Sequence, residues 1–337
     1  MSQRERAEQG PLRLSIAISD YDHVRDLVEG RVNAEGIELI PLRLSVEEIF
    51  YRFVTYREWD ISELSMAKYV SLISQDAEDL TAIPVFPSRV FRISGFYVRP
   101  DSPLQAPKEL RGLRVGIPEW SVTATVYGRA YLVHQEGIPL TEIEWIQGGV
   151  NQAGRAENAE LRLPEGVRYR QEKERTLEEM LIAGDLDAIL APRPPAGFLA
   201  GQRTVRRLVE QPRAAEEAYY RETGIFPIMH TIALRGSVVE RHPWVPLNLI
   251  AAFEKAKQNC YLRIGDATAS RLPVPWAHEP LQNARELMGD DPWPYGIEPN
   301  RKNLQAFLDY CLEQGVCHRP VSVEELFPKQ VSAVFRV

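Results

Sequence analysis

The segment WDISELSMAKY, residues 59–69, gathers polar side chains that could handle a small anion. It places Ser62, Glu63 and Ser65 where an apolar run meets the expected start of a helix. A helix N-terminus attracts negative charge and needs capping groups, so these side chains suit either a cap or a ligand site. Glu63 would serve as a proton carrier if a cleft desolvates it. The alternative is that Ser62 or Asp60 caps the helix and Glu63 only favours its positive end.

Arginines at the ends of strand-like runs form a second group. Arg89 directly follows Ser88 in the phrase PSRVFRIS after an apolar run, and Arg92 lies three residues further on. Arg193 follows the run DAILAP. The planar guanidinium group can bind a carboxylate through two parallel hydrogen bonds, so these positions suit a dicarboxylate. The alternative is that they are solvated surface arginines.

Thr123 and His230 complete the candidate set. Thr123 lies where the strand-like GIPEW meets a helical pattern, and Arg129 follows nearly two turns later, so a helix N-terminus there would form an anion cradle. A plain N-cap threonine is the alternative. His230 ends GIFPIMH and is the preferred proton-transfer residue, since imidazole exchanges protons near neutral pH. A core histidine with satisfied hydrogen bonds is its alternative.

Alternating strands and helices are needed to position these side chains. The run at 12–18 alternates as a strand and ends at Ser19-Asp20-Tyr21-Asp22, and polar residues at such a strand end are a typical ligand position. A second strand is predicted at 36–44. Capping boxes at Ser45 and Thr176 predict helix starts, and Gly184 fits a helix stop.

This order predicts α/β lobes with largely parallel sheets. The chain of 337 residues exceeds the usual size of one core, so we expect two lobes. We predict a discontinuous lobe I from 12–98 plus 228–337 and a lobe II from 99–227, with a ligand cleft between them. Pro227 in the return segment argues for an edge or a crossing segment and against a central strand. This arrangement is similar to the type II periplasmic binding proteins.

Composition and charge narrow the function classes. The formal charge of −7 gives no general field for nucleic acid or for an anionic membrane, so neither is expected as a partner. The opening segment lacks an apolar export signal, and Cys260, Cys311 and Cys317 form no CxxC pair, which together predict reduced thiols in the cytoplasm. The six histidines show no metal-binding spacing, so no metal is expected. A homo-oligomer stays open.

Six phrases give the sequence a specific resemblance. They are WDISELSMAKY, PVFPSRVFRIS, VGIPEWSVTATVYGRA, the run from GDLDAILAPRPP, ETGIFPIMH and DDPWPYGIEPNRKNLQAFLDYCLEQG. Together, and in this order, they resemble the 4,5-dihydroxyphthalate decarboxylase family from about residue 14 to residue 327. The chain differs from the family pattern at Ile93, where histidine is usual, and at Tyr127, where tryptophan is common.

The resemblance implies a cytoplasmic enzyme of the type II binding-protein fold that removes one carboxylate from a dihydroxylated aromatic diacid. Such a reaction needs cationic groups for the carboxylates, a base for a ring hydroxyl and an acid for the ring carbon, and it needs no cofactor. Because Ile93 replaces the expected histidine, the exact substrate stays open.

Two other functions fit the same scaffold. One is a non-catalytic solute-binding protein for an aromatic or small organic acid, and the other is a dehydratase of a cyclic carboxylate. Binding-protein folds serve receptors and enzymes alike, so the site has to distinguish them.

Overall fold

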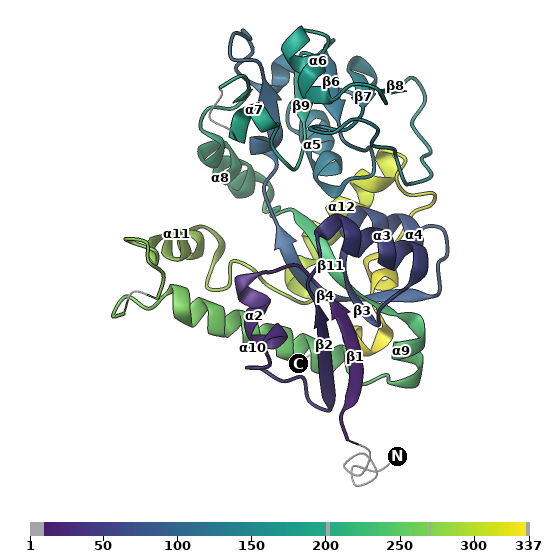
Figure 1. The fold of residues 1–337 in the computed structure, drawn as a ribbon, viewed down its shortest axis with the longest axis vertical. Coiled ribbons are helices and arrows are strands. Elements are labelled where there is room, and N and C mark those ends of the chain that lie inside the picture. The colour runs from purple at the N-terminus through teal and green to yellow at the C-terminus, as the bar shows by residue number, and fades with distance from the viewer. Residues whose placement is uncertain (1–9, 200–202, 270, 335–337) are drawn as a thin grey trace.

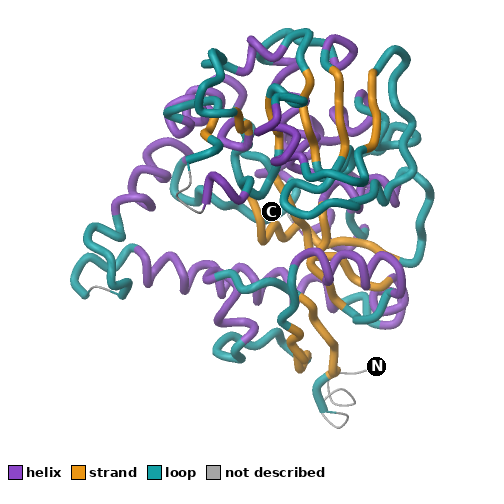
Figure 2. Tube along the Cα trace, turned by 45° about the horizontal axis from the view of Figure 1, so that its top comes forward, coloured by secondary structure: helices purple, strands orange, loops and turns teal. Residues whose placement is uncertain are grey.

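The computed structural model describes residues 10–199, 203–269 and 271–334. Its strands form two separate sheets, one in each half of the molecule (Figures 1 and 2). Residues 1–9, on which the export prediction rests, lie outside the described residues. The fold is the predicted two-lobed α/β arrangement.

The first sheet has five strands in the order β2-β1-β3-β11-β4. Strand β1 pairs in parallel with β2 and β3, whereas β11 runs antiparallel to both of its neighbours. The strands are β1 (Leu12–Ala17), β2 (Ile37–Leu42), β3 (Ile61–Ser65), β4 (Leu80–Arg89) and β11 (Ile228–Arg235).

The second sheet has six strands in the order β10-β5-β9-β6-β7-β8. Its centre is parallel, and β5 and β10 add an antiparallel edge. The strands are β5 (Phe96–Val98), β6 (Arg114–Ile117), β7 (Glu144–Gln147), β8 (Arg168–Gln171), β9 (Ala188–Leu190) and β10 (Arg206–Arg207).

Helices cover these sheets. Those that follow strands of the first sheet are α2 (Asp22–Val28), α3 (Val46–Tyr56), α4 (Met66–Ile73) and α9 (Gly236–Arg241). The helices between strands β6 and β11 are α5 (Thr123–His134), α6 (Leu177–Ala183), α7 (Ala196–Leu199) and α8 (Pro212–Thr223). The C-terminal part contains α10 (Val245–Ile264), α11 (Glu279–Met288), α12 (Arg301–Glu313) and α13 (Lys329–Val334). Short 3₁₀ turns lie at Ile93–Gly95, Pro107–Leu110, Leu140–Glu142, Glu298–Asn300 and Val323–Leu326.

The chain passes between the two sheets at two places. It leaves the first sheet after β4 and joins the second at β5, and it returns between α8 and β11. Helix α12 also packs against α4 and α5, so the C-terminal part touches both lobes. The lobe bounds at 98/99 and 227/228 stay a prediction; the pairing of β5 with β9 argues for drawing the first one at 90–95.

The expected helix start at Ser62 and Glu63 is wrong. Both residues, together with Ser65, belong to strand β3, and helix α4 begins only at Met66. Ser65 occupies the N-cap position but makes no capping hydrogen bond through its side chain. Neighbouring strands on both sides bury this segment fully, which favours a strand over the capped helix that its polar residues suggest.

Pro227 lies in the crossing between the two sheets, as one of its two predicted alternatives had it, but the predicted edge strand is wrong for the strand that follows. Strand β11 begins at Ile228, one residue beyond the proline, and lies between β3 and β4 inside the sheet. Pro227 therefore removes no ladder donor from the central strand. Strand β4 holds Pro84 and Pro87 instead, and it lies at the sheet edge, where a missing N–H is tolerated.

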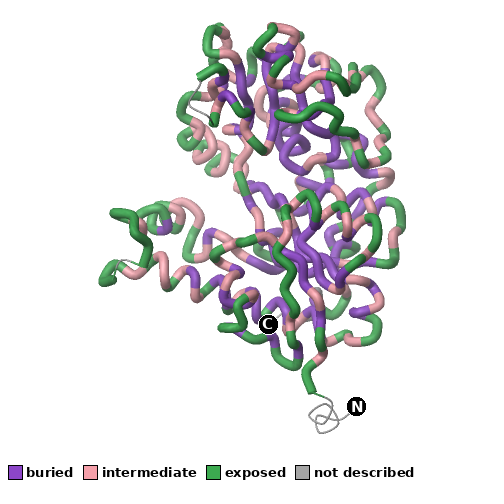
Figure 3. The backbone as a smooth tube through the Cα atoms, in the orientation of Figure 1, coloured by how far each residue is buried: buried purple, intermediate pink, exposed green. Residues whose placement is uncertain are grey.

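Local stop and start signals are confirmed where they do not depend on distant partners. The Thr176 hydroxyl accepts from Glu179 N, the Glu179 carboxylate accepts from Thr176 N, and Gly184 ends α6 at φ +84°. Ser45 caps α3 by accepting from Glu48 N. Strands and the inner faces of helices are buried in each half, while α11 and the loop before it are largely exposed (Figure 3).

Candidate functional site

Three neighbouring strands bring polar side chains together on one face of the first sheet. His230 on β11 lies opposite Ser65 on β3 and opposite Ser88 on β4. Directly opposed residues project to the same side of a sheet, and so do residues two apart along a strand. Glu63, two residues before Ser65, therefore shares this face. The antiparallel insertion of β11 thus makes a cluster from segments that lie far from His230 in the sequence.

A buried carboxylate holds the imidazole of His230. The Glu63 Oε1 atom lies 2.6 Å from His230 Nδ1, and the Glu63 side chain is fully buried while that of His230 is 17% exposed. Among the described residues, the hydrogen-bond contacts of the imidazole go to Nδ1, so Nε2 is the nitrogen left for a ligand. The ring of Phe50 on α3 packs edge-on against the imidazole, with centroids 4.9 Å apart. Glu63 thus fixes the tautomer and the orientation of His230.

Tyr21 and Ser19 complete the hydrogen bonding of Glu63. The Tyr21 hydroxyl donates to Oε1 at 2.6 Å, and Ser19 N donates to Oε2 at 2.9 Å. Burial alone would raise the pKa of Glu63, but the hydrogen bonds and charge of His230, with those from Tyr21 and Ser19, hold that pKa below its ordinary value. Glu63 is therefore a carboxylate anion at neutral pH.

Sequence reasoning indicated the segment of Tyr21 but not this residue. Polar residues at the end of β1 were expected at a ligand position, and the structure brings Ser19 and Tyr21 there. Burial, followed by the charge and hydrogen bond of Glu63, raises the pKa of Tyr21 far above its ordinary value. The hydroxyl therefore stays protonated and acts as a donor. Only the parallel pairing of β1 with β3 could reveal that it meets Glu63.

The second lobe reaches this face through Thr123. Its hydroxyl lies 2.9 Å from Ser65 Oγ and accepts from Ala67 N at 3.0 Å, which joins the first turn of α5 to the start of α4. Thr123 is the first residue of α5, and Val122 occupies the N-cap position. The two helix starts face each other across the lobes, an arrangement that favours negative charge between them.

Arg129 does not join Thr123 in a cradle. It is fully buried, its guanidinium lies 3.8 Å from the centre of the Trp120 ring, and it donates to Trp120 O and to Gln314 Oε1. Burial lowers its pKa to about 9. These contacts tie α5 to the segment after α12, which is a packing role.

Ser62 also points to internal partners. Its hydroxyl accepts from Trp59 Nε1 at 3.0 Å and donates to Glu63 O at 2.9 Å, and the residue is fully buried. These bonds hold the backbone of β3 next to Glu63 and leave no exposed surface for a ligand.

Arg89, the last residue of β4, is buried, and Arg92 in the turn that follows is half-buried; within the described residues neither forms an ion pair with a carboxylate. Arg89 donates to Asn300 Oδ1 and to Phe226 O, and its guanidinium lies over the Phe226 ring. Among the described residues, Arg92 has one hydrogen-bond contact, from Nε to the Met229 sulfur at 3.1 Å. Burial lowers the pKa of each to about 10. In the part of the chain that the structure describes, Arg92 therefore has the guanidinium group with more capacity left for an anion.

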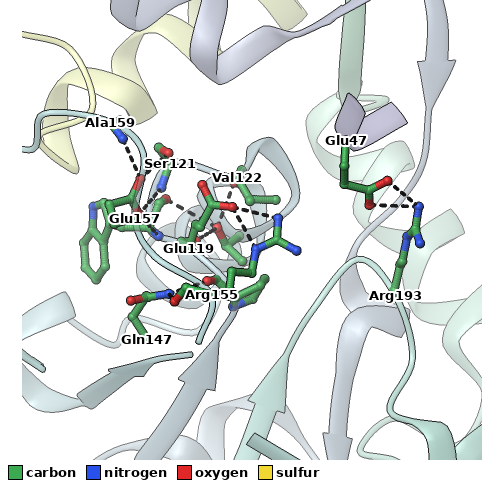
Figure 4. A network of polar contacts seen from close by, with 12 residues as sticks. Glu47, Glu119, Ser121, Val122, Gln147, Arg155, Glu157, Ala159 and Arg193 are labelled. Carbon is green, nitrogen blue, oxygen red and sulfur yellow. Dashed lines mark hydrogen bonds and ion pairs between the residues drawn. The ribbon is translucent and has the colours of Figure 1, made fainter. Parts of the chain in front are cut away.

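Arg193 forms an ion pair between the lobes. Its guanidinium binds the Glu47 carboxylate on α3 at 2.8 and 2.9 Å, and both side chains are largely exposed (Figure 4). This contact accounts for the charge of Arg193 in the present arrangement. Glu47 lies one helical turn from Phe50, which packs on His230, so α3 links the ion pair to the candidate site.

A second polar network, which sequence reasoning did not identify, lies beside α5. Glu119 binds Arg155 at 2.7 and 2.8 Å, and Glu157 accepts from Ser121 and from Trp120 N (Figure 4). Burial, outweighing Arg155 and aided by the charge of Glu157, raises the pKa of Glu119. The Lys68 ammonium on α4 faces these carboxylates and makes no hydrogen bond within the part of the chain that the structure describes.

The residues that depart from the expected family pattern are both buried. Ile93 lies in the turn between β4 and β5 and is 4% exposed. Tyr127 stacks on Phe307 with centroids 4.8 Å apart, and its hydroxyl accepts from Ile228 N at 3.3 Å, where the chain re-enters the first sheet. Tyr127 therefore packs between α5, α12 and β11.

Other classes of site find little support in the geometry. Cys260, Cys311 and Cys317 are buried and form no disulfide. Across residues 10–199, 203–269 and 271–334, no group of three or more His, Cys, Asp or Glu side chains is arranged to hold a metal ion. No helix in these ranges has the length and apolar character needed to cross a bilayer.

Comparison with known proteins identifies relatives of this chain. No family model matches the chain. It is 38% identical over 317 residues to the 4,5-dihydroxyphthalate decarboxylase of Comamonas testosteroni, covering 94% of this chain and 96% of that protein. It is 36% identical over 219 residues to the enzyme of the same name from Pseudomonas putida, covering 65% of this chain and 85% of that protein.

The fold also matches a solved structure. The periplasmic aliphatic sulphonate binding protein SsuA of Escherichia coli superposes with a TM-score of 0.54 at 15% identity, covering 95% of this chain and 93% of that one. This likeness supports the two-lobed binding-protein fold alone. The 38% identity to the Comamonas enzyme extends over nearly the full length of both chains, and the match to the Pseudomonas enzyme agrees with it. The chain belongs to the 4,5-dihydroxyphthalate decarboxylase family.

Proposed function

We propose that this protein decarboxylates 4,5-dihydroxyphthalate, or a close hydroxylated aromatic dicarboxylate, to protocatechuate and CO₂. Family membership supports the reaction class. The observation that carries the site is His230, whose Nδ1 is held by the buried Glu63 carboxylate while Nε2 stays available. A receptor for an organic acid needs no such buried acid–imidazole pair beside its ligand.

The reaction needs an electron sink in the ring. A hydroxyl group para to the departing carboxylate loses its proton and pushes charge into the ring, and the carbon that bears the carboxylate is protonated. The resulting dienone expels CO₂, and the bonding electrons return to the ring, which becomes aromatic again as the phenolate. One proton is consumed at carbon, and the hydroxyl proton is restored at the end.

His230 is the proposed acid for the ring carbon. As an imidazolium it would donate from Nε2, while the Nδ1–H bond to Glu63 keeps the ring in place before and after transfer. Glu63 is the proposed partner that stabilises the imidazolium. Because Glu63 is fully buried and already accepts three hydrogen bonds, we assign it this positioning role instead of direct proton transfer to substrate.

Arg92, Ser65, Ser88 and Thr123 are the proposed binding groups for the substrate carboxylates. The three hydroxyl residues lie around His230 and the facing starts of α4 and α5. Arg92 is a half-buried cation whose one hydrogen-bond contact among the described residues is to the Met229 thioether, although the Glu216 carboxylate lies near enough to act on its charge. A largely desolvated charge without an ion pair is costly, so an anionic ligand would relieve that cost. For Arg89 we propose a supporting role through Asn300 and Phe226.

The direct test is incubation of the purified protein with 4,5-dihydroxyphthalate. We expect equimolar CO₂ and protocatechuate, followed by gas release and by chromatography. Binding without turnover would instead identify a receptor, and absence of binding would point to another ligand.

Variants of the binding groups sharpen this test. Arg92→Ala should raise KM by ~10- to 100-fold, because a hydrogen bond to a charged group contributes about 1.5–3 kcal/mol. Arg92→Lys, which keeps the charge but loses the planar fork, is the matched control and should recover part of the loss. Equal KM values for all three proteins would remove Arg92 from the site.

We also propose the cytoplasm as the compartment. Three buried, unpaired thiols are typical of proteins from reducing environments. Cell fractionation with an antibody against the chain tests this, and recovery outside the cytoplasmic fraction would contradict it.

A further inference from the structure

Tyr21 meets the Glu63–His230 pair in an unusual way. Its hydroxyl and His230 Nδ1 both lie 2.6 Å from the same carboxylate oxygen, Glu63 Oε1, and they lie 3.4 Å from each other. Ser19 N occupies the other oxygen. The two donors therefore share one acceptor atom inside the protein.

Sharing an acceptor weakens each of the two bonds. A donor that stabilises a carboxylate anion lowers the basicity of that carboxylate. An imidazolium paired with a less basic carboxylate is less strongly stabilised, and it gives up its proton more readily. The hydroxyl that binds Glu63 thus acts on His230 without touching the substrate.

We propose that Tyr21 is a positioning residue that tunes the acid strength of His230 by sharing Glu63 Oε1 with it. The inference rests on the proposed function, since it takes the substrate ring carbon as the acceptor of the Nε2 proton. In the step itself, the imidazolium Nε2–H bond breaks and a C–H bond forms. The neutral imidazole that remains keeps its Nδ1–H bond to Glu63.

The surroundings of the Glu63–His230 pair favour Tyr21 as the group that sets the acid strength of His230. Among the described residues, the titratable groups that face His230 are Tyr21 and His23 from the segment after β1, with Glu63 from β3. Strand β4 contributes Ser88 and helix α3 contributes Phe50, neither of which is charged. Lys68 on α4 faces Glu119 and Glu157 of the other lobe instead.

Neighbouring rings hold the phenol in place. The Tyr21 ring packs against His23 with centroids 5.4 Å apart, and His23 packs at the same distance against Trp293. The Trp293 indole N–H donates to Phe86 O at 2.7 Å, which anchors this row to β4. Burial, its largest cause, lowers the pKa of His23 to about 4, so His23 is neutral and adds no competing charge at neutral pH.

Tyr21→Phe removes the shared donor and keeps the ring. In nitrogen NMR of histidine-labelled protein, with the His230 signals assigned from a His230→Gln sample, the deprotonation midpoint of His230 should rise by about one pH unit, since a hydrogen bond to a charged group is worth one to two such units. The basic limb of the pH profile of kcat should also move to higher pH. The value of kcat should fall about 10-fold, and KM should stay unchanged.

Two further variants keep the test decisive. Tyr56→Phe, on the exposed surface of α3, is the matched control and should change none of these values. A 3-fluorotyrosine placed at position 21 is a stronger donor and should shift the His230 midpoint downward, which tests the inference even if Tyr21→Phe folds poorly.

The outcomes separate this inference from the proposed function. An unchanged or lower His230 midpoint in folded Tyr21→Phe would overturn the tuning role, and so would a raised KM with an unchanged midpoint, which would make Tyr21 a substrate contact. A raised midpoint in a protein that does not decarboxylate the substrate would uphold the coupling and reject the reaction, because the NMR measurement needs no turnover.

Discussion

Glu63 in the first lobe and Glu119 in the second are both buried glutamates, but their environments act in opposite directions. Glu63 accepts from His230, Tyr21 and Ser19, and its pKa lies below the ordinary value. Glu119 pairs with Arg155 and has Glu157 and the Lys68 ammonium nearby, and burial raises its pKa. The two carboxylates therefore differ in the donors that surround them more than in their burial.

This difference indicates which carboxylate suits chemistry. Three donors make Glu63 a fixed anion that can stabilise a charged imidazole. Glu119 has the negative charge of Glu157 nearby, and the cations Arg155 and Lys68 do not offset its burial, so its ionised form is disfavoured. A buried carboxylate becomes a dependable anion only when hydrogen bonds replace the lost water.

The largest expected effect is a difference in kcat between variants of the two glutamates. Glu63→Gln removes the charge that stabilises the His230 imidazolium, so kcat should fall by ~10²- to 10⁴-fold, the usual range for general acid catalysis. Glu119→Gln is the matched control and should keep kcat within about five-fold. Similar losses in the two variants would end the contrast, and the measurement is steady-state kinetics with 4,5-dihydroxyphthalate.

The pH dependence of stability should have opposite signs at the two positions. Glu63 has a depressed folded-state pKa, so its contribution is present above the unfolded value near 4.3 and is lost as pH falls through the folded pKa. Glu119 has a raised folded-state pKa, so its ionisation lowers stability as pH rises from about 4.3 through the folded value.

Urea denaturation across this pH range tests the signs. The stability difference between the unaltered protein and Glu63→Gln should grow with pH below about 4.5, and the difference from Glu119→Gln should shrink with pH above it. Parallel curves for the two variants would contradict the opposite shifts.

A smaller change should move Glu119 toward ordinary behaviour. Glu157→Gln removes the neighbouring negative charge while keeping an acceptor for Ser121, so the pKa of Glu119 should fall. Carbon NMR of labelled glutamate side chains, assigned with Glu119→Gln, follows this titration. A complete return to the ordinary pKa would contradict burial as the main cause of the raised value.

The smallest effect is expected at the exposed glutamate. The Glu47–Arg193 pair spans the lobes but is solvated, so Glu47→Gln should change KM by less than about five-fold, and only at low salt. The charge-swapped protein Glu47→Arg with Arg193→Glu should recover the original KM. If neither salt nor the swap alters the effect, Arg193 acts on the substrate by another route, as a direct ligand would.

Local sequence signals predicted much of the fold. The Thr176 capping box and the stop at Gly184 depend on bonds within a few residues, and the structure confirms them. The start of α4 could not be found in this way, because the polar residues of 59–69 mimic a capped helix. Their assignment to β3 depends on pairing with β1 and β11, which are far away in the chain.

The candidate site could also be predicted only in part, because its contacts join segments that lie far apart in the chain. His230, Glu63, Ser65, Ser88 and Thr123 were all expected, and the structure brings them together. Arg129 was expected in an anion cradle, but its side chain packs against Trp120. A sequence pattern gives the position of an arginine along a helix, and only packing decides which side of the protein its guanidinium reaches.

The sequence by itself determined the two-lobed α/β class, the family and most of the polar residues, because periodicity, caps and motif phrases are local. Tertiary structure decided which of these residues act together. It inserted β11 antiparallel between β3 and β4, set the register that brings His230 to Ser65 and Ser88, and added Tyr21 to Glu63. Register and strand order depend on contacts between distant segments, so they are not encoded in any one stretch of the chain.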